Sequence, residues 1–403
     1  MMLKETLRNV VKMQRESLNL AEASVEREAL KQIEMKIPFA IVLSGIRRCG
    51  KSTLLKQLMK KIKGFYYFNF EDPRTINFEV EDFQKLDEIF FEEYGDKSYY
   101  FFDEIQNVQK WEIFVRAILD KKKYTIITGS NASLLSKELG TKLTGRHLRF
   151  ELFPFSYNEF LLLVNKKSSI SSFEEYFLCG GFPEYLNLKN PLVLQELLND
   201  ILNRDIATRH KLRNLKSLKE MALYLLTNTG KEFSYNNLGK TFDLGSSNTA
   251  VSFVSYFEDS YLLFTIPKFD YSLKKQRVNP KKAYSIDNGL TNVNSSSFSQ
   301  DKGKMLENMV FINLRKKFNN IFYFQDGGEC DFVVKEGTKI TRAIQVCFDL
   351  NEDNKDREIN GLVKALEKFG LENGMILTYN QEDELKTKDK RIKILPVWKW
   401  LLE

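Results

Sequence analysis

The sequence predicts an α/β protein whose first half is a parallel sheet with helices on both faces. Three observations predict this half. A glycine-rich loop, Gly45-Ile-Arg-Arg-Cys-Gly-Lys-Ser52, lies between an apolar segment and a segment with helical spacing. Two acidic residues end a later apolar segment, and other apolar segments alternate with helical ones. Beyond this half we expect a small helical module with two strands, and then a smaller α/β segment.

Composition excludes several classes of protein. At 403 residues, with 43% hydrophobic and 29% charged residues, the chain is long and apolar enough for several folded domains. No apolar run approaches the ~18 residues of a membrane helix, and the first eight residues lack the core of a signal peptide. The four cysteines lack metal-ligand spacing and there are 2 histidines, so a zinc site is not expected. We predict a reduced, cytoplasmic protein with no membrane partner.

The first segment, residues 1–34, is predicted to hold a charged helix that runs from Val11 to Leu30. Its composition indicates no role beyond packing or contact with another subunit.

The glycine-rich loop is predicted to bind the phosphates of ATP. It follows a β-branched strand, Phe39–Ser44, and opens a helix, Thr53–Ile62, which is the context of a phosphate-binding loop. Backbone N–H groups and the helix N-terminus face the phosphate. Lys51 would neutralise the β- and γ-oxygens, and the Ser52 hydroxyl would hold Mg²⁺. The predicted nucleotide-binding residues of the loop are Gly45, Ile46, Arg47, Arg48, Cys49, Gly50, Lys51, Ser52 and Thr53.

A pair of acids indicates that the nucleotide is hydrolysed. The hydrophobic strand Tyr99–Glu104 ends in Asp103 and Glu104. Asp103 is placed to hold Mg²⁺ through water, and Glu104 to polarise the attacking water. Such pairs are common on surfaces, but this one follows a phosphate-binding loop at a suitable distance, and hydrolysis is therefore the prediction.

The remaining strands of the predicted sheet are Phe65–Phe70, Tyr124–Thr128 and His147–Leu152. Ser130 and Asn131 follow the second of these. Either side chain would lie next to the γ-phosphate and report on the nucleotide state, or it would cap the helix that begins at Ala132. Both interpretations stay open.

Residues from about 35 to 165 resemble the AAA-type ATPases of bacteria and archaea that precede a C-terminal domain of unknown function. The shared features are Gly-Ile-Arg-Arg-Cys-Gly-Lys-Ser-Thr, Phe-Phe-Asp-Glu-Ile-Gln, Thr-Gly-Ser-Asn and Leu-Thr-Gly-Arg. Leu152-Phe-Pro-Phe-Ser-Tyr-Asn-Glu-Phe160 and Cys179-Gly-Gly-Phe-Pro-Glu184 fit the same family, so the resemblance covers nearly the whole chain. It implies an ATPase domain over 35–165.

The resemblance also implies that Arg146 is an arginine finger. Such a residue reaches the γ-phosphate of a neighbouring subunit and contributes roughly 10³–10⁵ in rate in well-studied switches. The active unit would then be a homo-oligomer, because each site needs two chains. The alternative is that Arg146 pairs with a local acid at the edge of the sheet.

Residues 166–210 are predicted to form a helical lid. A serine-rich linker, residues 168–172, opens this segment, and its long helix spans Leu192–Ile206. Arg204 and Arg209 would contact nucleotide or a neighbouring subunit, or they would be solvated or salt-bridged, as is usual on helix surfaces.

Residues 211–290 are predicted to form a winged helix, with helices at 233–242 and 248–257 and a hairpin from 261–266 and 282–286. The hairpin is basic: six cations against Asp270 give +5, whereas the whole chain carries +7. Cations of this kind bind phosphates without reading sequence, so DNA is the predicted partner. The alternative is that this module packs against the motor or a partner protein. The predicted DNA-binding residues are Lys268, Lys274, Lys275, Arg277, Lys281 and Lys282.

Residues 300–403 resemble the restriction-endonuclease-like PD-(D/E)XK nuclease core, in which carboxylates hold Mg²⁺ and a lysine orients water. Glu307, on a predicted helix, and Asp331, in a predicted turn before a strand, match the carboxylate positions. Gln345 stands where a third acid is expected, and Cys347 where the lysine belongs. Losing one such group costs ~10²–10³ in rate, so we expect a degenerate domain that docks DNA or subunits. One alternative is that the domain retains some nuclease activity. Another is that Glu307 and Asp331 are only surface acids.

Together these features predict an Mg²⁺-dependent, oligomeric ATPase that couples hydrolysis to binding or remodelling of DNA. One alternative is a regulatory switch that acts on protein partners. Another is an ATP-gated nuclease.

Overall fold

A computed structural model describes residues 1–18, 20, 24–130, 143, 145–212, 214–295, 301–387 and 389–403. Contacts divide the chain into two units, Met1–Phe153 and Pro154–Glu403, each with a core of its own. Among the described helices, none is long and apolar enough to cross a membrane.

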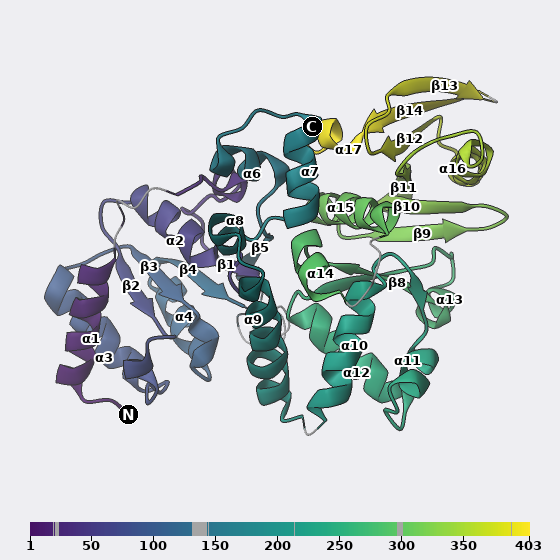
Figure 1. The fold of residues 1–403 in the computed structure, drawn as a ribbon. Helices are drawn as coiled ribbons and strands as arrows, with labels where there is room; N and C mark the ends of the chain where they lie inside the picture. Colours follow the sequence, from purple (N-terminus) through teal and green to yellow (C-terminus); the bar gives the residue numbers. More distant parts are fainter. Residues whose placement is uncertain are drawn as a thin grey trace. The chain divides into compact units, whose positions relative to one another are not determined.

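The first unit is built on a parallel sheet, as the sequence predicts (Figure 1). Its strand order is β2-β3-β4-β1-β5, and every neighbouring pair is parallel. The carboxyl ends of all these strands therefore meet at one edge, where an α/β sheet binds its ligands. The strands are β1 (Ala40–Gly45), β2 (Tyr66–Asn69), β3 (Tyr99–Asp103), β4 (Tyr124–Gly129) and β5 (His147–Leu152).

Helices cover both faces of this sheet. Val42, Phe102 and Ile127 share a core cluster with α1 (Lys4–Ser17), α3 (Asp82–Tyr94) and α4 (Trp111–Asp120). Phe101 and Ile126 directly precede Phe102 and Ile127 on their strands, so their side chains face the other side of the sheet. There α2 (Lys51–Lys60) packs against β1, β3 and β4. Short 3₁₀ turns are η1 (Glu28–Lys31), η2 (Pro73–Thr75) and η3 (Ile105–Asn107).

The N-terminal helix lies earlier than predicted. The sequence predicts a helix from Val11 to Leu30, whereas α1 ends at Ser17 and Leu30 belongs to the separate turn η1. The buried residues of α1 explain this shift, because they follow the spacing i, i+3, i+4, i+7 of one helix face. They are Leu7, Val10, Val11 and Gln14.

The second unit begins with helices. It includes α6, which the sequence places in the ATPase segment, and the region 166–210 is helical as expected. Arg204 is 69% exposed and lies 3.5 Å from Asp200, one turn earlier, which matches the salt-bridged alternative. The helices are α6 (Tyr157–Val164), α7 (Ile170–Cys179), α8 (Pro183–Leu188), α9 (Leu192–Asp200) and the π-helix η4 (Ile201–Thr208).

A small three-stranded sheet, in the order β6-β8-β7, follows with its own helices. The predicted hairpin is present, since β7 pairs with β8 in antiparallel register. Its connection, for which the sequence predicts no element, contains the short helix α13. The elements are α10 (Leu215–Thr227), β6 (Glu232–Phe233), α11 (Tyr235–Thr241), α12 (Ser247–Asp259), β7 (Leu263–Pro267), α13 (Leu273–Val278), β8 (Lys281–Ser285) and α14 (Asn288–Asn294).

The C-terminal segment forms a mixed sheet in the order β13-β14-β12-β11-β10-β9. Asp331 lies inside β10 and not in the preceding turn, because β10 pairs with β9 from Glu329 onward and shifts register between Cys330 and Val333. The elements are α15 (Lys302–Lys317), β9 (Ile321–Gln325), β10 (Glu329–Glu336), β11 (Lys339–Cys347), α16 (Lys355–Phe369), β12 (Asn373–Thr378), β13 (Asp383–Thr387), β14 (Lys390–Pro396) and α17 (Val397–Trp400).

Candidate functional site

The glycine-rich loop joins the carboxyl end of β1 to the first turn of α2. Gly50 precedes the helix with φ 99°, a conformation that glycine adopts without strain. At Gly45 a Cβ atom would lie 2.1 Å from the Leu152 carbonyl oxygen, so β5 approaches the loop too closely for any side chain. The loop therefore needs both glycines for its shape, independently of any ligand.

Lys51 begins α2 and is held by the loop itself. Its ammonium donates to the carbonyl oxygens of Gly45 and Ile46, both at 3.1 Å, and lies 3.8 Å from Glu104 Oε1. The side chain is buried, at 5% exposed. A buried cation with carbonyl partners is positioned to exchange them for phosphate oxygens.

The two oxygens predicted to bind Mg²⁺ lie together. Ser52 lies in the first turn of α2, close enough to the Asp103 carboxylate at the end of β3 to lower its pKa. Burial raises the pKa of Asp103 to about 6, with a further contribution from Glu104, while hydrogen bonds from Thr128 and Ser52 act in the opposite direction. Paired oxygen donors with a carboxylate are what Mg²⁺ prefers, so these residues fit the ion.

Glu104 leaves β3 in an unusual backbone conformation, with φ 52°. Its N–H donates to the Thr128 hydroxyl at 2.9 Å, and the same hydroxyl donates to Asp103. Gln106 donates to the Glu104 carboxylate. Left-handed backbone at a non-glycine residue is costly and is found where surrounding contacts hold a functional side chain.

Thr128 is a site residue that the sequence reasoning missed. It follows directly from the register, because β3 and β4 are parallel neighbours with Phe102 opposite Ile127. The next residues, Asp103 and Thr128, are therefore adjacent at the carboxyl edge. The pairing of β3 with β4, and not any local pattern, brings Thr128 to the acid pair.

Ser130 directly follows β4, which neighbours β1, and is 4% exposed. Its hydroxyl lies 3.5 Å from Gln106 Nε2, so it belongs to the same group as the acid pair. Asn131 lies outside the described residues, and so does the segment predicted to form a helix from Ala132.

Arg146 does not lie at this edge. It immediately precedes β5, and its carbonyl accepts from Ala40 N–H at the start of β1. A strand of six residues spans about 20 Å, so Arg146 lies at the opposite, amino edge of the sheet from the loop. Its guanidinium donates to Asp120 Oδ1 at 2.8 and 2.9 Å, which is the local pairing weighed above.

Arg27 is a second residue that the sequence reasoning missed. It is 2% exposed, and its guanidinium donates to the Cys49 carbonyl at 2.6 Å and to the Phe153 carbonyl at 2.7 Å. Its own N–H donates to Gln57 Oε1 on α2 at 3.1 Å. No local pattern marks an arginine 18 residues before Gly45, so only the folded chain reveals it.

The predicted basic surface of the hairpin is corrected at one position. Lys274, Lys275 and Arg277 are exposed, and Lys268 and Lys281 are partly buried. Lys282 is 2% exposed and so does not belong to this surface. Alternation along β8 explains the difference, because Lys282 faces inward toward the C-terminal segment while its neighbour does not.

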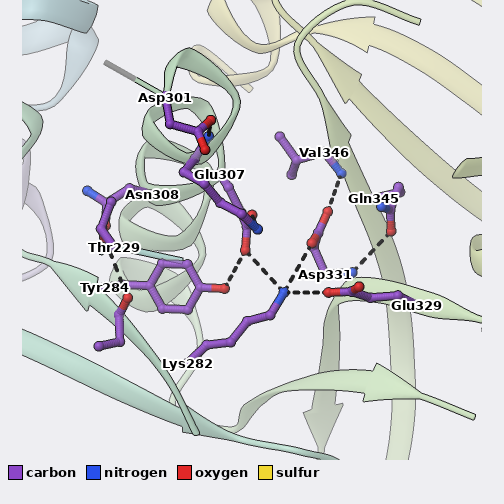
Figure 2. A network of polar contacts seen from close by, with 12 residues as sticks. Thr229, Lys282, Tyr284, Asp301, Glu307, Asn308, Glu329, Asp331, Gln345 and Val346 are labelled. Atoms are coloured by element: carbon purple, nitrogen blue, oxygen red, sulfur yellow. Dashed lines mark hydrogen bonds and ion pairs between the residues drawn. The ribbon is translucent and has the colours of Figure 1, made fainter. Parts of the chain in front are cut away.

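Lys282 lies among three carboxylates of the C-terminal segment (Figure 2). Its ammonium is 2.8 Å from Glu329, 3.4 Å from Glu307 and 3.4 Å from Asp331. Burial lowers the pKa of Lys282, but the three carboxylates outweigh this and raise it above its usual value. Burial and the nearby Glu307 raise the pKa of Asp331.

Two further contacts complete this carboxylate cluster, which we define as Glu307, Glu329 and Asp331. Tyr284 donates to Glu307 at 2.7 Å, and Lys304 lies 2.6 Å from the same carboxylate. The three acids thus face two lysines, which leaves a net charge of −1. The sequence placed Glu307 and Asp331 together correctly. It missed Lys282, which β8 brings to the cluster only through the tertiary fold, and it missed Glu329, two residues before Asp331 on β10.

Gln345 lies beside the cluster with its amide already engaged. Its Oε1 accepts from Asp331 N–H at 3.1 Å, and its Nε2 donates to Glu358 at 2.6 Å. Asp331 also accepts from Val346 N–H at 2.9 Å. The cluster lines a cavity of about 820 Å³. In the described chain, no group of three histidine, cysteine or acidic side chains is arranged to hold a metal ion.

Comparison with protein families divides the chain into three matched regions. Residues 38–161 match the AAA domain, residues 170–301 a domain of unknown function, DUF8612, and residues 302–400 a second one, DUF4143. The AAA match confirms the nucleotide-binding character of the first half and supports an ATPase activity.

Several relatives match nearly the whole chain. The uncharacterized protein MJ1544 of Methanocaldococcus jannaschii is 37% identical over 419 residues, which cover 95% of this chain and 93% of the relative. An uncharacterized protein of Haemophilus influenzae is 29% identical, and the match covers 95% of this chain and 100% of the relative.

Among solved structures, C. elegans PCH-2 is similar over 42% of this chain and 47% of its own chain, at 16% identity and a TM-score of 0.22. The chain belongs to the family of AAA-domain proteins that includes MJ1544.

Proposed function

We propose that this protein is an Mg²⁺-dependent ATPase that works as a homo-oligomer and couples hydrolysis to binding or remodelling of DNA. The observation that carries the proposal is the meeting of Lys51, Ser52, Asp103 and Glu104 at the carboxyl edge of one parallel sheet. The proposed nucleotide site also includes residues 45–53, Ser130 and Asn131.

Each group at this edge has a distinct proposed role. Lys51 releases the loop carbonyls and binds the β- and γ-phosphates, and Ser52 with Asp103 holds the metal ion. Mg²⁺ held by these two residues would neutralise negative charge on the phosphates. Glu104 lies 3.8 Å from the lysine and polarises the attacking water. Thr128 fixes the acid pair by bonding to both residues.

The position of Arg146 supports an oligomer. Since it lies about 20 Å from the loop of its own chain, it serves as an arginine finger only toward a second copy. Its partner Asp120 is 57% exposed, and Arg146 itself is 36% exposed. A surface pair of this kind contributes little to stability, so Arg146 can leave Asp120 at small cost.

Residues 211–290 are proposed to form a winged helix that contacts DNA through its hairpin. The supporting order along the chain is α10-β6-α11-α12-β7-α13-β8, and β8 lies between β6 and β7 in the sheet. Helix α12 contains no lysine or arginine, whereas the hairpin connection holds Lys274, Lys275 and Arg277. Phosphate contacts would therefore come from the hairpin and not from the second helix.

Residues 300–403 are proposed to be a degenerate nuclease-like domain that docks DNA or subunits. Helix α15 supplies Glu307, β10 supplies Asp331 and β11 supplies Gln345. The ammonium of Lys282 lies 3.4 Å from both Glu307 and Asp331, so the protein supplies positive charge beside these carboxylates. This arrangement supports charge compensation by the protein itself.

Steady-state ATP hydrolysis tests the proposal. The rate is measured with Mg²⁺ alone and with duplex, single-stranded and forked DNA of equal length, with Lys51→Ala as the blank and Glu104→Gln as a variant that binds without hydrolysis. Stimulation by one DNA form is the expected result. An ATP hydrolysis rate that no DNA form changes would contradict the coupling and would favour a switch that acts on protein partners.

An ATP-gated nuclease is the second candidate, favoured by the cavity beside the carboxylate cluster. Cleavage of linear and circular DNA is assayed with Mg²⁺ or Mn²⁺, with and without ATP. Metal-dependent cleavage that Asp331→Ala abolishes while ATPase activity persists would establish this candidate. The degenerate domain predicts no cleavage above the blank.

A further inference from the structure

The connection between β7 and β8 carries an exposed apolar surface. This surface belongs neither to the proposed nucleotide site nor to the proposed phosphate contacts. We define the wing tip as residues 271–278, the segment Tyr-Ser-Leu-Lys-Lys-Gln-Arg-Val. Three large apolar side chains are exposed within it: Tyr271 by 75%, Leu273 by 79% and Val278 by 75%. Among the described residues, no other segment of eight holds three exposed large apolar side chains, and such clusters mark interaction sites.

Both ends of the wing tip are fixed to one residue of β9. Phe269 N–H donates to the Tyr323 carbonyl at 2.8 Å, and the Tyr323 hydroxyl donates to the Pro280 carbonyl at 2.8 Å. The Phe269 ring packs edge-on against Phe322 and Phe369, with centroids 5.6 and 4.8 Å apart. The tip is thus fixed to the C-terminal sheet. Its three large apolar side chains stay exposed, and the Tyr271 ring also packs edge-on against Phe269 with centroids 5.2 Å apart.

Local hydrogen bonds give the tip a defined shape. The Asp270 carboxylate accepts from Ser272 N–H at 2.8 Å, and the Asp270 carbonyl accepts from Gln276 Nε2 at 2.5 Å. The Asn279 N–H donates to the Lys275 carbonyl at 2.8 Å and closes α13. A segment held in this way presents its outer side chains without an ordering cost at the moment of binding.

The charge of the tip identifies the kind of partner. Lys274, Lys275 and Arg277 are exposed and lie among the apolar side chains, and the tip contains no acid. A polyanion that also offers flat apolar surface satisfies both features, and nucleic acid does so through its phosphates and bases. Apolar wedges flanked by cations insert between base steps in many DNA-binding proteins.

We propose that the wing tip inserts Leu273 and Val278, with Tyr271 as a stacking platform, where the base stack of DNA is already interrupted, at a junction between duplex and single strand. This inference rests on the proposed DNA binding and specifies its substrate. Insertion into an intact stack must first separate neighbouring bases, whereas a junction offers an open base face without that cost. The protein therefore binds forked DNA more tightly than a blunt duplex of equal length and charge.

Binding of the full chain to forked and blunt duplexes tests this proposal, with 2-aminopurine at the junction to report unstacking. The wild-type protein is expected to prefer the fork about tenfold and to raise the 2-aminopurine fluorescence. Leu273→Ser with Val278→Ser is expected to remove both effects and to keep the affinity for blunt duplex. The changed side chains are exposed, so the fold is retained.

Lys274→Ser with Lys275→Ser is the matched control. It is expected to weaken binding to both DNA forms equally and to flatten the salt dependence by about two phosphate contacts. A fork preference that survives Leu273→Ser with Val278→Ser overturns the inference and leaves DNA binding intact. Absence of binding to either DNA form removes the proposed DNA function itself. Binding to vesicles of anionic phospholipid is measured as well. If the wild type binds them, Leu273→Ser with Val278→Ser does not, and no fork preference is seen, the inference is overturned in favour of a membrane surface.

Discussion

Arg27 fixes the shape of the phosphate-binding loop by binding a carbonyl group of the loop backbone. Its guanidinium fixes the Cys49 carbonyl at 2.6 Å. In a planar trans peptide the carbonyl and the following N–H point in opposite directions. Holding the Cys49 oxygen toward Arg27 therefore turns the Gly50 N–H away from Arg27. Arg27 is a positioning residue, because it acts on the phosphates only through the loop.

Replacing Arg27 by Met should weaken nucleotide binding about tenfold or more, since a charged hydrogen bond contributes roughly 1.5–3 kcal/mol. We expect KM and the Kd of a fluorescent ATP analogue to rise, with kcat changed less. Arg27→Lys should recover part of the loss, because an ammonium can still reach the Cys49 carbonyl.

Lys61→Met is the control for this change. Lys61 donates to the Leu30 carbonyl at 3.4 Å and so joins the same N-terminal segment to the end of α2 without touching the loop. Equal effects of Arg27→Met and Lys61→Met on KM would show that Arg27 acts through general stability, against the prediction.

At the scale of elements, β8 joins the small three-stranded sheet to the C-terminal sheet. Lys282 and Tyr284 alternate with Lys281 along this strand and both reach the carboxylate cluster. A buried pair loses its solvation on folding, and removing one partner leaves an uncompensated charge that costs about 3–5 kcal/mol. The contact between β8 and the C-terminal sheet is therefore stable only while the Lys282 ammonium compensates the carboxylates.

Lys282→Met should lower the thermal stability of the protein, and the loss should grow as pH rises from about 5 to 8. Burial already raises the folded-state pKa of Asp331, and loss of the nearby ammonium raises it further. The same change removes the attraction to Lys282 that lowers the pKa of Glu329. The folded state then keeps protons that the unfolded state releases, so the free energy of unfolding falls as pH increases. Thermal melts at several pH values measure this slope.

Lys304→Met provides the comparison, because Lys304 contacts only Glu307 of the cluster and is 30% exposed. We expect a smaller loss of stability with a weaker pH dependence. A Lys282→Met protein whose melting temperature matches wild type at pH 8 would show that the cluster does not depend on this lysine.

At the scale of the whole molecule, the proposed ATPase is complete only in an assembly. Each chain presents its nucleotide-binding edge and its Arg146 at opposite ends of the sheet, so one face of a copy would complete the site of the next. Such head-to-tail contacts close into rings when the rotation permits.

Mixing two inactive variants tests this arrangement. Arg146→Ala keeps its own nucleotide site but lacks the finger, and Lys51→Ala keeps the finger but lacks a working site. Mixed assemblies should regain ATPase activity, because some Arg146→Ala sites would receive Arg146 from a Lys51→Ala neighbour. Activity that remains at the level of the separate variants, in assemblies shown to exchange subunits, would contradict a finger in trans. Arg146→Lys, which keeps charge without the planar fork, should not replace the wild-type residue.

The sequence by itself determined the parallel sheet, the loop and the acid pair, because these depend on local patterns: apolar strands, a glycine spacing, and acids at a strand end. It also placed Glu307 and Asp331 near each other. Only the tertiary structure decided that Arg27 braces the loop, that Thr128 bonds both acids and that Lys282 lies inside a carboxylate cluster. These contacts join residues 22 to 126 positions apart, and side chains at such separations meet through the packing of whole elements, which no local spacing encodes.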